Sequence, residues 1–350
     1  MGVPAARPPR HGYDRRPVLT VCCDTSRLSM QRPAGDAVYA AHVLERLAEA
    51  DEITIVGAAE ARYADALLNL DGRFRPGRGQ VVVSTVTDLG HLFARRAYGP
   101  RRWLAQNWRV ASAARRSDRV LVPSTAVRDG IERYLNVRQD RVVVLPPLPA
   151  AHFRRRGPAE VELVRQRLGL PTPYLLFVGT RSARKNLALL GAAWKQARVA
   201  PREVALVLAG PGRGGLPGAH DLGYVPAPPL APLLSGALAW LNPSLYEGSA
   251  IGALEAMACG PPVVAAATGA QAHAVDLNGL LLPPDDVGAW AQALEAVVED
   301  PALRRRLSAA GLRRVRELRA SPPEVWPLVA ALSATPRRRG RPRAEGEGSG

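Results

Sequence analysis

Two glutamates, Glu247 and Glu255, are separated by seven residues across a predicted strand-to-helix turn. The apolar run 238–241 indicates a buried strand. Residues 250–259 are good helix formers, and a Gly-Pro-Pro sequence ends them. Glu247 is therefore expected in the loop after a strand, and Glu255 inside the next helix. In open α/β sheets, ligands bind at this carboxyl edge of the strands.

The loop between the glutamates has the features of an anion site. The backbone N–H groups of Gly248, Ser249 and Ala250, ahead of a helix, suit an anion such as a diphosphate. Two carboxylates beside it can bind sugar hydroxyls on one side and a ribose on the other. A capped core helix with two solvated glutamates explains the same spacing, so the spacing alone leaves both interpretations open.

A second group of candidates follows the predicted strand 174–178, which ends at Gly179. Arg181, Arg184 and Lys185 lie in a short basic loop, where they would stabilise the charge that develops on a leaving diphosphate. Lys donates as a compact point charge, and Arg binds two phosphate oxygens with its planar fork. The alternative is a solvated basic loop. Arginine is preferred throughout the chain, so a lysine at this position is not explained by composition.

The elements that would position these residues alternate between strands and helices, which favours parallel βαβ units. Strand-like runs occur at 18–23, 53–56, 81–86, 120–122, 142–145, 174–178, 204–209, 238–241, 263–266 and 280–282. Helical patterns occur at 37–50, 124–135, 187–197, 250–259 and 286–298. Prolines after residue 145 indicate a hinge. We therefore expect an α/β fold of two Rossmann-like domains that face a cleft.

The 350 residues divide into five predicted parts. These are a disordered basic tail at 1–17, an abbreviated first domain at 18–147, an interdomain linker at 148–172, a second domain at 173–332 and a disordered tail at 333–350. The net charge of +16 favours anionic partners such as phosphates, acidic lipid headgroups or nucleic acid. Three cysteines, without disulfide or metal spacing, indicate a reducing, cytoplasmic location. No signal peptide or membrane span is predicted, so any membrane contact would be peripheral.

The segment 243–264 resembles the donor-site signature of glycosyltransferase family 4, the retaining group 1 glycosyltransferases of GT-B fold. The matching residues are Pro243, Ser244, Glu247, Gly248, Glu255, Ala256, Met257, Ala258, Cys259, Gly260, Pro262, Val263 and Val264. Ser249 and Ala250 replace the usual Phe-Gly. Arg184, Lys185 and Asn186 match the family's Arg-Lys-Asn. The resemblance covers about 18–316 and is weakest toward the N-terminus.

The resemblance implies a metal-independent retaining glycosyltransferase without a cofactor. Its donor would be a nucleoside-diphosphate sugar and its acceptor a glycan or a lipid-linked molecule, as in cell-envelope polysaccharide synthesis. It implies catalytic roles for Glu247, Lys185 and Arg184, with Glu247 on the donor sugar and Glu255 on the ribose. The implied donor site comprises Gly35, Gly179, Arg181, Arg184, Lys185, Tyr224, Val225, Glu247, Gly248, Ser249, Ala250 and Glu255.

Two departures concern the reacting sugar. The family often has His-Asp after the third or fourth strand, whereas here Thr87 precedes Asp88 and His91 follows three residues later. Asp88 and His91 are the candidates on the acceptor side. His273 stands where many members carry Glu. Two alternatives therefore stay open: a catalytically weak GT-B protein that binds a nucleotide sugar or nucleic acid, and a nucleotide-sugar epimerase, although no acid–base carboxylates are placed for the latter.

Three further patterns are less specific. Residues 210–215 imitate a dinucleotide fingerprint, but no helix follows, so a surface loop is expected. Residues 92–116 contain many arginines, Trp103 and Trp108 but no acid, which indicates either docking on an anionic membrane or a solvated basic face. The tail 336–343 resembles a minor-groove hook, and we interpret it as a basic tail rather than a nucleic-acid site.

Overall fold

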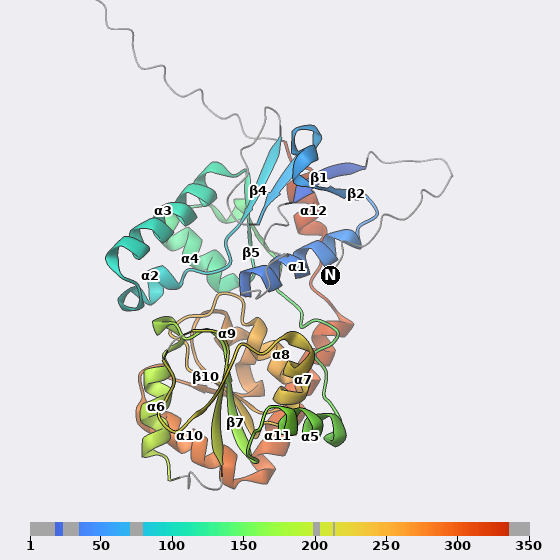
Figure 1. Ribbon diagram of the computed structural model, residues 1–350. Helices are drawn as coiled ribbons and strands as arrows, with labels where there is room; N and C mark the ends of the chain where they lie inside the picture. The colour runs from blue at the N-terminus through green and yellow to red at the C-terminus, as the bar shows by residue number, and fades with distance from the viewer. Residues whose placement is uncertain (1–17, 24–34, 71–79, 199–203, 213, 336–350) are drawn as a thin grey trace, which may run out of the picture.

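The computed structural model describes residues 18–23, 35–70, 80–198, 204–212 and 214–335. Over these residues the chain forms two α/β domains, each built on a six-stranded parallel sheet (Figure 1). The two-domain prediction is confirmed. The predicted tail at 1–17, the loop 24–34 and the basic tail at 336–343 lie outside the described residues.

The first sheet has the strand order β2-β1-β3-β4-β5-β6. Its strands are β1 (Leu19–Cys23), β2 (Ile53–Val56), β3 (Ala66–Asn69), β4 (Val81–Thr85), β5 (Arg119–Val122) and β6 (Val142–Val144). Around it lie α1 (Gly35–Ala48), α2 (Gly90–Phe93), α3 (Pro100–Arg116), α4 (Thr125–Leu135) and the 3-10 turns η1 (Ala58–Tyr63), η2 (Arg95–Ala97) and η3 (Gln139–Arg141). Helices on both faces explain why the central strands are almost continuously apolar. The buried strand β3 was not predicted.

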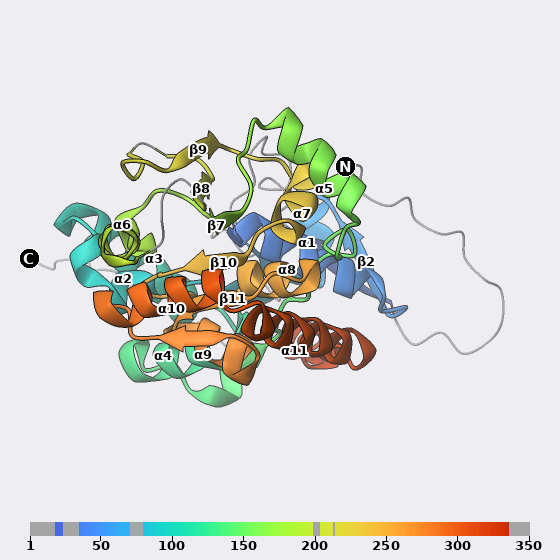
Figure 2. The same ribbon diagram turned by 90° about the horizontal axis from the view of Figure 1, so that it is seen from below.

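The second sheet has the order β12-β11-β10-β7-β8-β9. Its strands are β7 (Tyr174–Val178), β8 (Ala205–Ala209), β9 (His220–Gly223), β10 (Ala239–Asn242), β11 (Val263–Ala266) and β12 (Leu280–Leu282). Its helices are α5 (Pro158–Arg167), α6 (Leu187–Gln196), α7 (Ala227–Ser235), α8 (Ile251–Cys259), α9 (Gly269–Val275), α10 (Val287–Glu299) and α11 (Pro301–Ala320), with turns η4 (Ala183–Lys185) and η5 (Asp276–Asn278). Figure 2 shows these elements from below.

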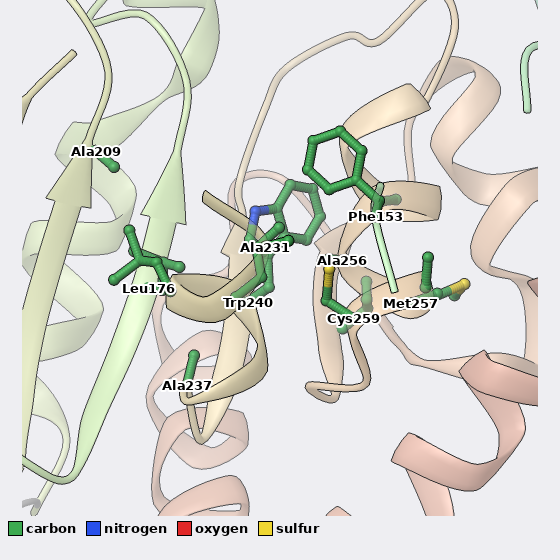
Figure 3. Close-up of a cluster of buried hydrophobic side chains, with 14 of the residues drawn as sticks. Phe153, Leu176, Ala209, Ala231, Ala237, Trp240, Ala256, Met257 and Cys259 are labelled. Carbon is green, nitrogen blue, oxygen red and sulfur yellow. The ribbon is translucent and has the colours of Figure 1, made fainter. Parts of the chain in front are cut away.

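The core of the second domain extends into the segment predicted as a linker. Trp240 on β10 is 2% exposed and belongs to the same buried cluster as Phe153 and Ala231 (Figure 3). The same segment forms α5, whose Val164 packs against this core. Residues 148–172 are therefore largely part of the second domain, which corrects the prediction of a plain linker.

The C-terminal helix α12 (Trp326–Leu332) returns to the first domain. Leu328, Val329 and Leu332 are buried in the core that includes β1, β3 and β4. The sequence predicts residues 326–332 in the second domain, whereas their packing places them in the first. Within the described residues, the chain therefore crosses between the domains twice. None of the helices among the described residues is long and apolar enough to cross a membrane.

Candidate functional site

The site lies where loops from the two domains meet. A Cβ atom on Gly248, in the loop between β10 and α8, would lie 2.0 Å from the carbonyl oxygen of Thr87 in the first domain. The Ser124 hydroxyl, at the start of α4, donates to the carbonyl of Gly248 over 2.7 Å. Only glycine permits this approach, so the match at Gly248 has a structural reason.

Glu247 is the centre of a charged cluster at this junction. Lys185 Nζ donates to Glu247 Oε1 at 2.5 Å, and both side chains are 13% exposed. Arg184 Nη1 lies 3.5 Å from Glu247 Oε2 and 3.6 Å from Asp88 Oδ2. The same guanidinium donates to the carbonyl of Tyr246. Three predicted catalytic residues and Asp88 are thus brought together from both domains.

The charged side chains of Glu247, Lys185 and Arg184 are mostly buried. Burial alone would raise the pKa of Glu247, but the Lys185 ammonium and the Arg184 guanidinium outweigh it and lower the pKa to about 2. Burial raises the pKa of Asp88, although Arg184 opposes this. Burial would lower the pKa of Arg184, yet the carboxyl groups of Glu247 and Asp88 raise it. At neutral pH, Glu247 is therefore an anion and Arg184 a cation, although both side chains are mostly buried.

Glu255 lies in the second turn of α8, as predicted, and is half-buried. Burial raises the pKa of its carboxyl group to about 8. Among the residues that the structure describes, none forms a hydrogen bond or an ion pair with this carboxyl group. The role of this carboxyl group on a ribose stays a prediction.

Arg181 is placed differently from the expectation that it reaches a diphosphate. Its guanidinium binds Asp221 on β9 through two contacts, Nη1 to Oδ2 at 2.7 Å and Nη2 to Oδ1 at 2.5 Å, and its side chain is 1% exposed. Its N–H donates to the carbonyl of Pro211. A Cβ on Gly212 would lie 2.5 Å from Arg181 Cβ. Arg181 therefore anchors the loop after β8, whose described residues form no helix, and does not present a free cation.

The other predicted donor residues lie on separate loops. Gly179 directly follows β7 and packs so closely on Gly210 that a Cβ on Gly210 would lie 2.0 Å from the Gly179 carbonyl oxygen. Tyr224 and Val225 follow β9; Tyr224 is half-buried and Val225 is 9% exposed. Gly35 begins α1, directly after the undescribed segment. The proposed contacts of Gly35, Tyr224 and Val225 with a donor stay predictions.

His91 lies in α2 and is buried, at 1% exposure. Burial, reinforced by Arg109, lowers its pKa to about 4, so the imidazole is neutral at pH 7. Its Nε2 atom has no hydrogen-bond partner within the described chain. Asp88, by contrast, accepts a hydrogen bond from the N–H of Gly90 and faces Arg184. Of the two acceptor-side candidates, Asp88 belongs to the charged cluster, whereas His91 is buried and makes no hydrogen bond or ion pair with Glu247, Lys185 or Arg184. His273, where the family often has Glu, is exposed on α9.

The sequence reasoning missed two kinds of neighbour. Asn242, at the end of β10, lies 3.4 Å from Glu247 through its Nδ2 atom. The sequence signal for this neighbour is that the otherwise apolar strand β10 ends in an amide side chain, that of Asn242. Tyr246 stacks on Phe93 of the first domain with ring centroids 4.7 Å apart. Among the described residues there is no group of three or more His, Cys, Asp or Glu side chains that could hold a metal ion.

Comparison with known proteins shows to which family the chain belongs. Residues 6–148 match the family profile described as Glycosyltransferase Family 4, and residues 172–300 match Glycosyl transferases group 1. O-antigen chain mannosyltransferase B of Escherichia coli is 28% identical over 273 residues, which are 73% of this chain and 71% of that protein. D-inositol 3-phosphate glycosyltransferase of Frankia alni is 36% identical over 243 residues, 61% of this chain and 58% of that protein. The chain thus spans little more than half the length of the latter relative.

Solved structures show the same fold at low sequence identity. Sucrose-phosphate synthase from Thermosynechococcus elongatus has a TM-score of 0.69 at 21% identity, covering 87% of this chain and 95% of that one. Anabaena HepE in complex with UDP-glucose has a TM-score of 0.66 at 17% identity, covering 85% of this chain and 94% of that one. The predicted GT-B fold is confirmed. With one family profile matched in each domain, the chain belongs to the group 1 glycosyltransferases of glycosyltransferase family 4.

Proposed function

We propose that the chain transfers a sugar from a nucleoside-diphosphate sugar to a glycan or lipid-linked acceptor, with retention of configuration and without a metal. The observation that carries this proposal is the cluster of Lys185, Arg184 and Glu247 at the junction of the two domains. The UDP-glucose bound by HepE and the mannosyl transfer named for the E. coli relative support a donor of this class.

The geometry suggests how the work is divided. Lys185 and Arg184 would neutralise the negative charge that develops on the leaving diphosphate, the task for which a metal is used elsewhere. Glu247 would accept hydrogen bonds from the donor sugar, and Glu255 from the ribose. For retention, the acceptor hydroxyl approaches the face from which the diphosphate leaves. A new C–O bond forms at the anomeric carbon as the old one breaks, and the hydroxyl proton passes to the departing phosphate oxygen.

A thermal-shift panel with UDP-, GDP-, ADP- and dTDP-sugars tests the donor class. A donor present at about 100 times its Kd stabilises the folded protein by about 2.7 kcal/mol, which raises Tm measurably. We expect one donor to raise Tm, and Glu255→Ala to abolish the shift. A cooperative transition that no donor moves would contradict the donor site and favour the alternative of a protein that binds another partner, such as nucleic acid.

Turnover tests the catalytic assignment. Lys185→Ala should lower kcat by roughly 10²–10³ if Lys185 stabilises the leaving group. Unchanged kcat would remove that role. The anomeric configuration of the product, read by NMR, decides between retention and inversion, and a chelator should leave the rate unchanged.

A specific surface supports peripheral attachment to an anionic membrane from the cytoplasmic side. On α3, Leu104 and Trp108 are 61% and 67% exposed in an arginine-rich sequence without acids. Leu104 also lines an open cavity of about 600 Å³, together with Arg95, Arg96, Tyr98, Pro100 and Trp103. Apolar side chains among arginines suit the headgroup region of acidic lipids.

Co-sedimentation with vesicles tests this surface. Vesicles that contain phosphatidylglycerol should bind the protein, and pure phosphatidylcholine vesicles should bind it weakly. The double variant Leu104→Ser, Trp108→Ser should lose most of the binding. Leu277→Ser is the matched control, because Leu277 is 88% exposed on the second domain. Equal losses in both variants would contradict docking through α3.

A further inference from the structure

Two buried side-chain amides lie behind Glu247. Asn242 ends β10 and is 4% exposed, while Gln271 lies in α9 and is fully buried. Asn242 Nδ2 donates to Gln271 Oε1 over 2.6 Å. Burying two amides is costly unless their hydrogen bonds are made. Their partners therefore show what the pair is built to hold.

The protein backbone determines the orientation of Gln271. Its Nε2 atom donates to the carbonyl of Ala266 at 2.9 Å and to the carbonyl of Asn242 at 3.3 Å. Carbonyl oxygens only accept, so the NH₂ end must face them. Turning the amide over would set an oxygen against two oxygens. Gln271 Oε1 must consequently face Asn242.

This orientation determines what Asn242 presents to Glu247. Asn242 Oδ1 accepts from the Ser244 hydroxyl at 2.5 Å and from the Ser244 N–H at 3.3 Å. One N–H of its NH₂ group donates to Gln271. The other faces Glu247 Oε1 at 3.4 Å. The pair therefore offers a donor, and not an acceptor, to the Glu247 carboxylate.

The same helix also holds the backbone of Glu247. The N–H of Ala270 donates to the Glu247 carbonyl at 2.8 Å. Gly269 has a φ of 53°, and a Cβ there would lie 2.3 Å from that carbonyl oxygen. Both the backbone and the side chain of Glu247 are thus supported from the first turn of α9, although Gln271 comes 24 positions after Glu247 along the chain.

We infer that Asn242 and Gln271 are positioning residues which orient the Glu247 carboxylate toward the donor sugar. Lys185 and Asn242 both donate to Oε1, whereas the nearest cation to Oε2 is Arg184 at 3.5 Å. Oε2 makes the longer of these contacts, and we assign it to a sugar hydroxyl beside Arg184, which also hydrogen-bonds to this carboxylate. This assignment rests on the proposed donor site and adds the residues that set its selectivity for the sugar.

The test compares each sugar nucleotide with its nucleoside diphosphate, because Glu247 contacts only the sugar. Calorimetry with UDP-glucose, UDP, GDP-mannose and GDP measures the four affinities in wild type, Asn242→Leu and Gln271→Leu. With the donor that wild type binds, both variants should lose about 10-fold in affinity for the sugar nucleotide relative to its diphosphate. KM for the donor should rise by a similar factor.

Gln80→Leu is the matched control. Gln80 is 7% exposed in the first domain and donates through Nε2 to two backbone carbonyls, of Ala61 and Ala64. Its replacement should lower Tm and leave the affinity ratio unchanged. If Gln80→Leu lowers the ratio as much as Gln271→Leu, or if neither site variant lowers it, the positioning role is overturned.

A measurement without ligand separates this inference from the proposed function. The Tm changes caused by Asn242→Leu and Glu247→Ala should be non-additive in the double variant, because the two residues share a hydrogen bond. If the two Tm changes are additive, Asn242 and Glu247 do not share this hydrogen bond, and the inference is overturned. If wild type binds neither these four nucleotides nor any donor of the thermal-shift panel while the changes are non-additive, the support of Glu247 stands, and both the proposed donor and the role toward its sugar fall.

Discussion

Replacing Lys185 by Met tests the charged pair at the centre of the site. The side chain keeps its length but loses its ammonium, so Glu247 keeps only Arg184 as a cationic neighbour. Lys185 is the stronger of the two opposing charges that lower the pKa of Glu247. Without it, burial should return that pKa to its ordinary value or above.

The pKa gives the expected size of the effect. A pKa lowered from 4.5 to about 2 corresponds to about 3 kcal/mol of folding free energy. The loss in Lys185→Met should therefore be about 3 kcal/mol at pH 7, similar to the roughly 3–5 kcal/mol for breaking a buried ion pair. Tm should fall by roughly 5–10 °C.

The dependence on pH has a definite sign. The pKa of Glu247 is lower in the folded than in the unfolded protein, so its stabilisation is complete above pH 4.5 and is lost as the pH falls toward 2. At pH 3 only about 1 kcal/mol should remain. The difference in stability between wild type and Lys185→Met should therefore shrink between pH 7 and pH 3.

Urea unfolding at pH 7, 5 and 3 measures this difference. Lys195→Met is the control, because Lys195 is the only other lysine and is exposed on α6; it should change stability by no more than about 0.5 kcal/mol. A loss in Lys185→Met that is the same at pH 7 and pH 3, or no larger than in the control, would refute the reasoning.

Three further changes follow from single positions. Ala250 has a φ of 52°, so Ala250→Gly should raise stability by up to about 1 kcal/mol, the relief of backbone strain being partly offset by a freer unfolded chain; a loss above that size by calorimetry would contradict the strain. Gly248→Ala would set a Cβ 2.0 Å from the Thr87 carbonyl oxygen and should therefore separate the domains. Turnover should fall on the order of 100-fold. X-ray scattering should show a larger radius of gyration, while the circular dichroism spectrum stays unchanged. Burial raises the pKa of Glu255 to about 8, so this group destabilises the folded state increasingly as the pH rises from 4.5 to 8. Glu255→Gln should therefore raise Tm at pH 8 and leave it unchanged at pH 4. A higher Tm at both pH values would point to another cause.

Much of the fold was predictable because parallel strands covered on both faces are continuous apolar runs. β4, β7, β10 and β11 are of this kind and were predicted within two residues. β9 was missed because this edge strand reads His-Asp-Leu-Gly, with two polar residues exposed. α7 was missed because its three prolines suggest a loop; two of them lie in its first turn, where the missing N–H groups cost little.

The site was predictable where its parts are local in sequence. Glu247 lies in the loop after β10 and Lys185 in the loop after β7, and both strands have a clear apolar signal. Glu255 lies within the predicted helix α8. Arg181 was misplaced because its partner Asp221 lies on β9, which was itself not predicted. The support from Gln271 could not be predicted for a similar reason. Its side chain meets Asn242 at the end of β10, and a polar residue in a short helix does not indicate which residue it faces.

The return of α12 to the first domain also has a mechanical consequence. The chain crosses between the domains once after β6 and again after α11. Arg319, near the end of α11, donates to the carbonyls of Pro149, Ala150 and Phe153, so the two crossings lie side by side. Two adjacent covalent connections permit bending about one axis and resist twisting about the others. The domains would then rotate about a single hinge axis that runs through the two connections. Lys185 and Asp88 would return to the same relative position each time the domains close.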